Sequence, residues 1–203
     1  MALFITFEGG EGSGKSVQSG ILYRRLVKLG IPALLTHEPG GTPLGRRLAR
    51  GLKWSRDERL SPLTELLLFN ASRAQLVAEV IKPGLGAGKV VICDRYTDST
   101  IAYQSFARGL SLETVEAINN TATQGLKPNL TFLLDVPAEE GLIRKEGKKR
   151  DRFEQEAITF HQRVHDGYCN LAAREPERWL VIDGRQPKQK IAEIIWQKVS
   201  QLL

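Results

Sequence analysis

The segment FITFEGGEGSGKS, residues 4–16, joins a strand pattern to a glycine-rich loop. It opens with alternating β-branched and aromatic residues, which are typical of a β-strand. Gly9 and Gly14 then bracket four residues. Lys15 and Ser16 follow directly and complete the spacing of a phosphate-binding loop. Backbone N–H groups in such a loop turn toward an anion, so the segment predicts a site for a nucleoside triphosphate.

The parts of this loop have different expected roles. Lys15 is expected to reach the outer phosphates, and the hydroxyl of Ser16 to hold a magnesium ion. The alternative is a glycine-rich turn that only joins strand to helix, and the helical pattern that follows at once argues against it. The residues expected around the triphosphate are Gly9, Gly10, Glu11, Gly12, Ser13, Gly14, Lys15 and Ser16.

The composition is that of one globular domain spanning residues 1–203. The chain is 41% hydrophobic and 26% charged, and no apolar run approaches the length of a membrane span. The first strand pattern begins directly after the start of the chain. We therefore expect no signal peptide, a cytoplasmic location and no membrane partner.

The cysteines and histidines give no sign of a disulfide or a metal site. Cys93 lies in an apolar strand pattern and Cys169 in a helical one, so both are expected to be buried thiols. His37, His161 and His165 lack partners at metal-ligand spacing, and the last two are expected on a solvated helix face.

The net charge of +6 is concentrated in two basic segments. Residues 46–59 and 144–152 each hold six basic and two acidic side chains. Neither segment alternates its charges with aromatic residues, as a surface for single-stranded nucleic acid would. We therefore expect no nucleic-acid partner and attribute the charge to a small substrate rich in phosphate.

Strand patterns alternate with helical patterns along the rest of the chain. The strands mostly lack polar alternation, which indicates a parallel sheet covered by helices on both faces. Ser61 and Pro62 are expected to start a helix as its cap and first residue. After the first strand, the predicted strands are 33–36, 90–93, 130–135 and 179–183. The predicted helices are 15–29, 44–53, 62–81, 99–107, 153–171 and 187–202, with a further short helix before the basic run 144–152.

Polar residues follow two of these strands at their carboxyl ends. EPGGT, residues 38–42, follows the second strand, and DRY, residues 94–96, follows the third. Ligands gather at this edge of open α/β sheets, so a second pocket is expected to face the triphosphate. We find no DxxG-type segment after the third strand and no NKxD-type guanine reader. A small phosphotransferase is therefore favoured over a nucleotide switch.

Seven segments stand in a characteristic order: FEG (7–9), EPGGT (38–42), FNASR (69–73), DRY (94–96), STIAYQ (99–104), DRFE (151–154) and VIDG (181–184). Together they resemble the thymidylate kinases of the nucleoside monophosphate kinase family, and the resemblance covers nearly the whole chain. It implies an α/β, three-layer P-loop kinase fold. In this fold helices flank a five-stranded parallel sheet, and a mobile basic lid spans about 141–152.

The resemblance also implies an activity and its partners. Members of the family transfer the γ-phosphate of ATP to dTMP with Mg²⁺, giving dTDP, in dTTP synthesis. They are homodimers, so a homodimer is expected here. The expected metal ligands are Ser16 and Asp94, and Asp94 also matches an acidic group near the acceptor phosphate.

The family's substrate contacts can be placed on this chain one by one. Phe69 matches the ring that stacks on thymine, and Arg73, on the same helix face, matches the arginine that bonds the base edge. Arg95 matches the arginine that binds the acceptor phosphate. Glu11 matches the acidic residue that contacts the sugar 3′-hydroxyl. Tyr103 matches the ring that fills the space of a ribose 2′-hydroxyl. The expected substrate-binding residues are Glu11, Glu38, Pro39, Phe69, Arg73, Arg95, Ser99, Tyr103 and Gln104, with Ser99 and Gln104 at the base edge.

The family has two branches that differ in where a catalytic arginine lies. One branch carries it in the loop, at the position of Gly12, and this chain resembles the other, which uses lid arginines. Arg185 is the expected contact to adenine, and Val17 completes the ATP-binding set. The expected catalytic residues are Lys15, Arg95, Arg144 and Arg150, with Lys149 and Arg152 as second choices.

Two departures from the family pattern and several alternatives stay open. Val17 stands where many relatives have a second hydroxyl residue, and His37 where many have arginine. Taken alone, Phe69 is more often a core residue, Arg95 a surface ion pair and Tyr103 a packing residue. A kinase for another small acceptor is the second interpretation. A non-catalytic nucleotide switch or a nucleic-acid-binding ATPase is the third.

Overall fold

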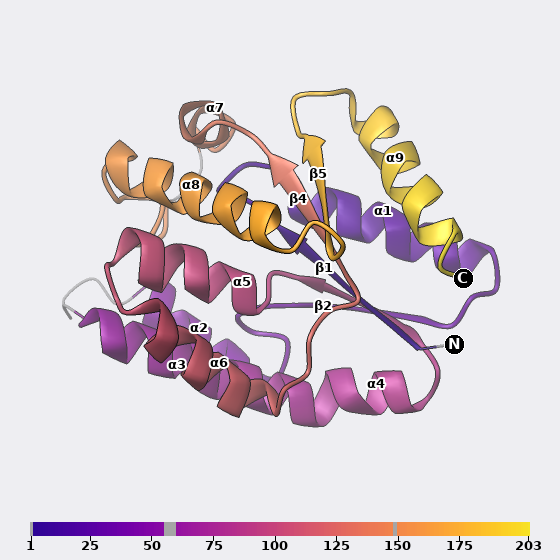
Figure 1. Ribbon diagram of the computed structural model, residues 1–203, viewed down its shortest axis with the longest axis horizontal. Helices are drawn as coiled ribbons and strands as arrows, with labels where there is room; N and C mark the ends of the chain where they lie inside the picture. Colours follow the sequence, from indigo (N-terminus) through magenta and orange to yellow (C-terminus); the bar gives the residue numbers. More distant parts are fainter. Residues whose placement is uncertain (1, 55–59, 148–149) are drawn as a thin grey trace.

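The computed structural model describes residues 2–54, 60–147 and 150–203. Within these ranges five strands form one sheet in the order β2-β3-β1-β4-β5, and every neighbouring pair is parallel (Figure 1). The predicted five-stranded parallel sheet is therefore confirmed. The strands are β1 Leu3–Glu8, β2 Ala33–His37, β3 Val90–Asp94, β4 Leu130–Asp135 and β5 Trp179–Asp183.

Helices cover both faces of this sheet (Figure 1). They are α1 Lys15–Lys28, α2 Pro43–Trp54, α3 Pro62–Leu76, α4 Lys82–Gly86, α5 Thr97–Thr100, α6 Leu112–Thr123, α7 Ala138–Ile143, α8 Ile158–Arg174 and α9 Lys188–Ser200. A π-helical segment, Val77–Ile81, joins α3 to α4, and a second, Ile101–Ala107, extends α5. Ser61 caps α3 as predicted, with its side chain accepting the N–H of Thr64 at 3.2 Å.

The sheet separates two layers of apolar packing. Ile5 and Phe7 of β1 are buried against α1 and α9, together with Leu22 of α1 and Ile195 of α9. Phe4, which directly precedes Ile5, points to the opposite face and packs near the π-helical segment that follows α3. Strands buried on both faces account for the continuous apolar runs in the sequence. The three-layer arrangement is thus confirmed.

The register of the strands aligns their carboxyl ends. Phe7 of β1 lies opposite Asp94 of β3 and Phe132 of β4. The turn after β2 joins the same edge, because the N–H of Glu38 donates to Asp94 O at 2.9 Å. The segments that follow β1, β2 and β3 therefore meet at one edge of the sheet.

The elements that differ most from the sequence prediction are α8 and α6, and α4 also lies beyond the predicted helix end at residue 81. Helix α8 begins at Ile158 and not at residue 153, because Asp151 Oδ1 accepts the N–H groups of Phe153 and Glu154, at 3.0 Å each, and holds a turn there. Phe153 continued the apolar spacing because it is buried, not because it is helical. Helix α6 lies in a stretch for which the sequence patterns predict no element.

The side chains of α8 are less solvated than their sequence pattern indicates. The expected solvated face is wrong, since His161 is 5% exposed and His165 is half-buried. The expectation that His165 has no partner is also wrong, because it contacts Asp135 and Cys169. Cys93 and Cys169 are free thiols as predicted, although Cys169 is only half-buried. Among the described residues, no helix is both long and apolar enough to cross a membrane.

Candidate active site

The loop between β1 and α1 is shaped by glycines with positive φ. Gly9, Gly12 and Gly14 have φ values of 139°, 68° and 95°, a region that favours glycine. A Cβ on Gly9 would lie 2.6 Å from Leu134 O, and one on Gly12 would lie 2.0 Å from Gly141 O. The loop therefore excludes side chains at both positions by close contact with its surroundings.

Lys15 folds back over the loop that precedes it. Its Nζ donates to Gly9 O at 2.9 Å and Gly10 O at 2.7 Å, and it lies 3.2 Å from Ser13 Oγ. Burial lowers the pKa of Lys15 to about 8, and the nearby charge of Arg95 adds to this effect. The cationic group is thus fixed inside the loop by backbone oxygen atoms.

Ser16 and Asp94 bring two oxygen ligands together. Asp94 ends β3, Ser16 lies in the first turn of α1, and the Ser16 hydroxyl donates to Asp94 Oδ2. Mg²⁺ prefers oxygen ligands and is commonly held by one or two carboxylates together with substrate phosphates. This donor set fits the predicted magnesium site.

Arg95 adopts a backbone conformation that few residues other than glycine adopt. Its φ is 70°, and its N–H donates to Phe7 O at 2.9 Å. The turn directs the guanidinium across the end of β1, where it donates to Glu11 Oε1 at 2.7 Å and Gly9 O at 3.2 Å. Such outliers cluster at functional sites, where the surrounding structure enforces them.

Three hydroxyl groups surround the same guanidinium. Ser99 Oγ, Tyr168 OH and Tyr103 OH lie 3.3, 3.0 and 3.3 Å from its nitrogen atoms. Tyr103 OH also donates to Glu11 Oε1 at 2.9 Å. With 16% of its side chain exposed, Arg95 is a largely buried centre of a network and not a surface ion pair.

Glu11 is the anion of this network. Burial would raise its pKa, but Arg95, Lys15 and Lys145 outweigh burial and hold the pKa of this carboxyl below its ordinary value. Lys145 Nζ lies 3.5 Å from Glu11 Oε2. Glu11 therefore connects the loop, the segment after β3 and the predicted lid.

Glu8 is a second carboxyl, completely buried beneath the network. It accepts the N–H of Tyr96 at 2.7 Å and the hydroxyl of Ser99 at 2.6 Å. It also accepts the hydroxyl of Tyr168 at 3.0 Å. Burial, with a contribution from Asp98, raises the pKa of Glu8 to about 7. Glu8 thus fixes two of the hydroxyls that surround the guanidinium.

A cavity of about 50 Å³ opens on one side of Arg95. Phe69 lines it from α3 and packs against Phe153, with ring centroids 5.7 Å apart. Phe69 is half-buried, so it combines packing with access to the cavity. Every predicted substrate-binding residue lines this cavity: Glu11, Glu38, Pro39, Phe69, Arg73, Arg95, Ser99, Tyr103 and Gln104.

Arg73 is almost completely buried in this wall, with 1% exposed. Its Nε donates to Glu38 Oε2 at 2.8 Å. Burial raises the pKa of Glu38 to about 7, although the charge of Arg73 opposes the shift. The other acceptors of the guanidinium are Asn70 Oδ1, Thr100 Oγ1, Asn119 Oδ1 and Tyr96 O, at 3.2, 3.0, 2.8 and 3.0 Å.

Two buried oxygen atoms in this cavity wall lack hydrogen-bond partners among the described residues. They are Glu38 Oε1 and Gln104 Oε1. Gln104 is completely buried, and its Nε2 donates to Glu65 Oε2 at 3.3 Å. An unpaired buried acceptor costs about 1–3 kcal/mol, so each oxygen is a favourable partner for a donor on a bound molecule.

A larger cavity of about 940 Å³ lies on the loop side of Arg95. Residues 11–17 line it together with His37, Asp94 and Arg144, so the unusual Val17 and His37 both face it. The two cavities share the residues Glu11, Glu38, Pro39, Lys53, Arg95 and Asp151. The loop and the smaller cavity therefore meet at a common wall.

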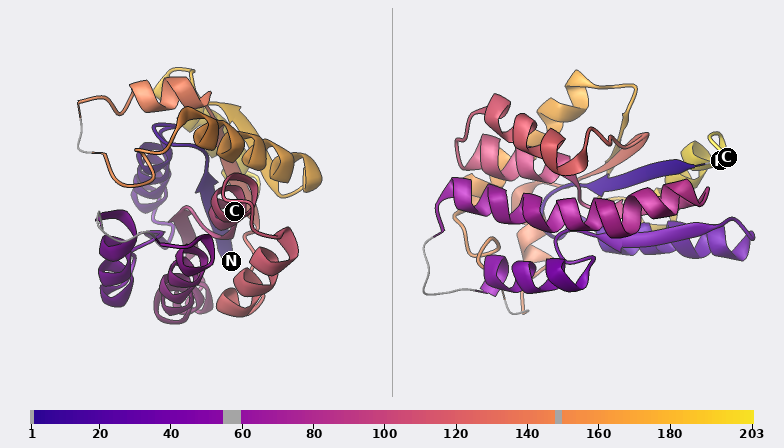
Figure 2. Two further views of the ribbon diagram at one scale, coloured as in Figure 1. Left: turned by 90° about the vertical axis from the view of Figure 1, so that its left-hand side faces the viewer. Right: turned by 90° about the horizontal axis from the view of Figure 1, so that it is seen from below.

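Of the basic residues after α7, some contact this site and others point away from it. Arg144 donates to Gly184 O at 3.1 Å and lines the larger cavity. Arg152 points to Glu65 Oε1, at 3.0 Å, and to Leu52 O, because the segment after α7 returns to the end of α2 (Figure 2). Lys145, which the sequence analysis did not select, contacts Glu11 in the loop.

Several predicted residues lie apart from both cavities. Arg150 is exposed and lines neither. Arg185 is also exposed, and its Nε donates to Asp183 Oδ1 at 2.9 Å. Lys149 falls outside the described residues. The predicted roles of these residues stay predictions.

Sequence reasoning missed the residues that support the site from behind. Glu8 belongs to the FEG segment but carries no pattern that marks a buried carboxyl. Tyr168 reads as one more apolar position of α8, and Asn119, which accepts from Arg73, lies in the helix that was not predicted. Their roles depend on contacts between distant segments.

The fold and the site together define a class of protein. A parallel α/β sheet carries a glycine-rich loop with the spacing of a phosphate-binding loop after its first strand, and a second polar cavity shares a wall with that loop. These are the features of a nucleotide-binding kinase. The chain belongs to the thymidylate kinase family, because the model of the family described as thymidylate kinase matches residues 7–195.

Individual relatives agree with the family match. The thymidylate kinase of Dehalococcoides mccartyi strain CBDB1 is 56% identical over 203 residues, which is 100% of this chain and 98% of the relative. The thymidylate kinase of Geotalea uraniireducens strain Rf4 is 49% identical over 198 residues, covering 94% and 92%. The crystal structure of thymidylate kinase from Ehrlichia chaffeensis superposes with a TM-score of 0.80 at 35% identity, covering 98% of both chains.

Proposed function

We propose that this protein transfers the γ-phosphate of ATP to dTMP, giving dTDP, with Mg²⁺ accompanying ATP. Family membership supports the reaction. The observation that carries the proposal is the shared wall of the two cavities, where Arg95 and Glu11 stand between the loop and the smaller cavity. Two substrates bound on either side would have their phosphates facing each other.

The donor would lie in the larger cavity. The loop presents backbone N–H groups and the N-terminus of α1 to its phosphates, and Lys15 supplies a fixed positive charge. Ser16 and Asp94 would hold Mg²⁺, which supplies charge to the outer phosphates. With a pKa of about 8, Lys15 is mostly protonated at neutral pH.

The acceptor dTMP would lie in the smaller cavity. Phe69 offers a ring for stacking on thymine, and the unpaired Gln104 Oε1 is a partner for the one N–H donor of that base. Arg95 would hold the phosphate, and Glu11 the sugar 3′-hydroxyl. Tyr103, fixed by its hydrogen bond to Glu11, would occupy the space of a 2′-hydroxyl.

The transfer step needs positive charge around the moving phosphoryl group. Negative charge spreads over its equatorial oxygens in the transition state, and donors aimed at them lower the barrier. Lys15 and Arg95 approach from the loop and the acceptor side, and Arg144 from α7. A lid that closes further would add Arg150 and exclude water.

A panel of nucleoside monophosphates tests this function. ADP release is measured with ATP, Mg²⁺ and each of dTMP, dUMP, dCMP, dAMP, dGMP and the ribose counterpart of dTMP. We expect the wild-type protein to have its highest kcat/KM with dTMP. The preference for dTMP over its ribose counterpart is expected to be smaller in Tyr103→Ala than in wild type. A higher kcat/KM with another monophosphate would favour a different acceptor, and turnover that ignores every acceptor would contradict a kinase.

The same proposal includes a homodimer, a single domain over residues 1–203 and a cytoplasmic location without nucleic-acid partners. These follow from the family resemblance and the composition. Sedimentation at micromolar concentration measures the oligomeric state, and a monomer there would contradict the dimer.

A further inference from the structure

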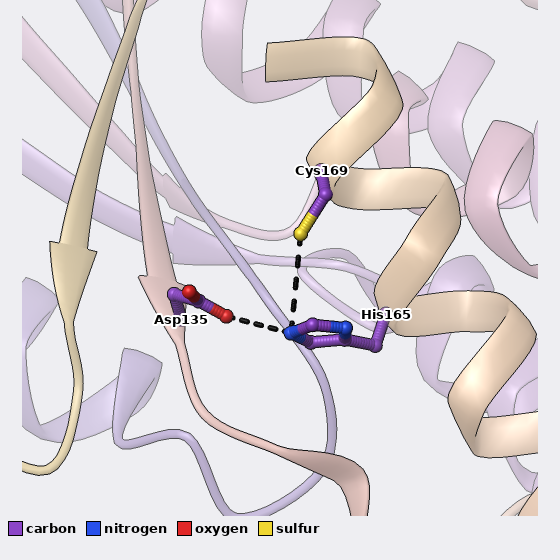
Figure 3. A group of neighbouring side chains, drawn as sticks. All are labelled: Asp135, His165 and Cys169. Atoms are coloured by element: carbon purple, nitrogen blue, oxygen red, sulfur yellow. Dashed lines mark hydrogen bonds and ion pairs between the residues drawn. The ribbon is translucent and has the colours of Figure 1, made fainter. Parts of the chain in front are cut away.

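Three side chains that can bind a transition metal lie together at the end of β4 (Figure 3). Asp135 is the last residue of β4, whereas His165 and Cys169 stand four residues apart on α8 and share a face. Their ligand atoms all lie within 4.8 Å of one another, and all three residues are half-buried. None of them lines either cavity of the candidate active site.

Two contacts of this cluster use the same imidazole nitrogen. His165 Nε2 lies 2.7 Å from Asp135 Oδ1 and 3.9 Å from Cys169 Sγ (Figure 3). A cysteine nucleophile activated by histidine needs another arrangement, in which the carboxylate holds one ring nitrogen and the thiol meets the other. Here oxygen, nitrogen and sulfur converge on one region, as the ligands of a metal ion do.

The opposite ring nitrogen has a carboxylate nearby. His165 Nδ1 lies 3.7 Å from Asp166 Oδ1, which is an ion-pair distance and longer than a hydrogen bond, and the Asp166 side chain is 77% exposed. Metal-ligating histidines nearly always direct their other N–H to a carboxylate or carbonyl, which fixes the tautomer and the ring orientation. In the tautomer that carries its proton on Nδ1, the lone pair of Nε2 is available to a cation between Asp135 and Cys169.

We propose that Asp135, His165 and Cys169 bind a divalent transition-metal ion of the Zn²⁺ type. Thiolate, imidazole and carboxylate are all ligands of Zn²⁺, and three protein ligands leave a fourth position for water. The thiolate disfavours Mg²⁺, which takes oxygen ligands, so this site differs chemically from Ser16 and Asp94. Binding releases to solvent the thiol proton of Cys169 and any proton on His165 Nε2.

The metal would tie α8 to the sheet. Asp135 O accepts the N–H of Gly184 at 2.8 Å, so the end of β4 is already fixed to the turn after β5. Because a metal must displace the thiol proton and any proton on the ligating imidazole nitrogen, we expect it to bind less tightly as the pH falls.

The test is a titration of metal-free protein with Co²⁺, a spectroscopic substitute for Zn²⁺, in excess Mg²⁺ that occupies the Ser16–Asp94 oxygens. One equivalent is expected to give a thiolate-to-Co²⁺ charge-transfer band, which Zn²⁺ then abolishes. Cys169→Ser is expected to remove the band and weaken Zn²⁺ binding at least about tenfold. The matched controls Cys93→Ser and His161→Gln are expected to keep the charge-transfer band and the wild-type affinity for Zn²⁺.

Alkylation of the wild-type chain gives a second readout that requires no variant to fold. Zn²⁺ is expected to slow the reaction of Cys169 with iodoacetamide about tenfold, measured on the modified peptide by mass spectrometry. If Asp135 and His165 form only an ion pair beside a thiol, Co²⁺ gives no charge-transfer band and Zn²⁺ gives no protection. Either result, or a band that survives Cys169→Ser, overturns the proposal.

Discussion

Replacing Glu8 with glutamine tests the electrostatics beneath the candidate active site. The carboxyl is 0% exposed and accepts hydrogen bonds from the N–H of Tyr96 and from two hydroxyls, those of Ser99 and Tyr168. An amide can keep all three contacts. Its carbonyl oxygen can accept from Tyr96, and the hydroxyls can accept from its NH₂ group. Glu8→Gln therefore removes a buried charge while preserving the packing.

The expected effect depends on pH, and its sign follows from burial. The pKa of Glu8 is raised from 4.5 to about 7, first by desolvation and then by Asp98. Between pH 4.5 and about pH 7, the carboxyl of Glu8 is protonated in the native protein and ionised in the unfolded chain. The resulting stabilisation is present below pH 4.5 and is lost as the pH rises through about 7. At about 1.36 kcal/mol per pH unit, the total is about 3 kcal/mol.

The assay is urea unfolding of wild type and Glu8→Gln at pH 5 and pH 8. Glutamine does not titrate, so the variant does not lose this stability as the pH rises. The free energy of unfolding of Glu8→Gln minus that of wild type is therefore expected to be about 2–3 kcal/mol higher at pH 8 than at pH 5. Glu116→Gln, on the exposed side of α6, provides the background for exchanging a carboxylate for an amide. A relative stability that agrees within about 0.5 kcal/mol at the two pH values would refute the raised pKa.

The remaining predictions concern turnover and binding. Lys15→Ala is expected to abolish turnover in a folded protein, checked by ADP release and circular dichroism, because no other cation lies inside the described loop. Phe69→Ala is expected to weaken dTMP binding by about 1–3 kcal/mol in calorimetric titration, the value of one base–aromatic stack; unchanged affinity would make Phe69 a packing residue only. Arg144→Ala is expected to lower kcat about tenfold or more, worth about 1.4 kcal/mol, with little change in KM. If neither it nor Arg150→Ala does so, the lid arginines are not catalytic.

The sheet and its loop could be predicted because their signals are local. A strand buried on both faces reads as an apolar run, and the loop needs glycines at fixed positions next to Lys15 and Ser16. The nine expected substrate-binding residues could be named because their segments resemble a family. That they line one cavity is a property of the fold alone.

What could not be predicted depends on contacts across the chain. Asp135 and His165 belong to different elements, so only the packing of α8 on β4 shows that they touch. Lys145 and Arg150 belong to one basic run. The sequence favoured Arg150, but of these two residues it is Lys145 that contacts Glu11. Phe153 continued a helical spacing that the hydrogen bonds of Asp151 interrupt.

The close packing of Gly141 on Gly12 explains why, in our proposal, Arg144 and not a loop residue brings positive charge to the transfer step. A Cβ on Gly12 would lie 2.0 Å from Gly141 O, and one on Gly141 would lie 2.2 Å from Glu11 O. While α7 keeps this position, the loop has no room for a longer side chain at Gly12. The same packing places Arg144, at the end of α7, within 3.5 Å of Gly12 O. The helix that excludes a longer side chain from the loop thus carries a cation, Arg144, at its own C-cap.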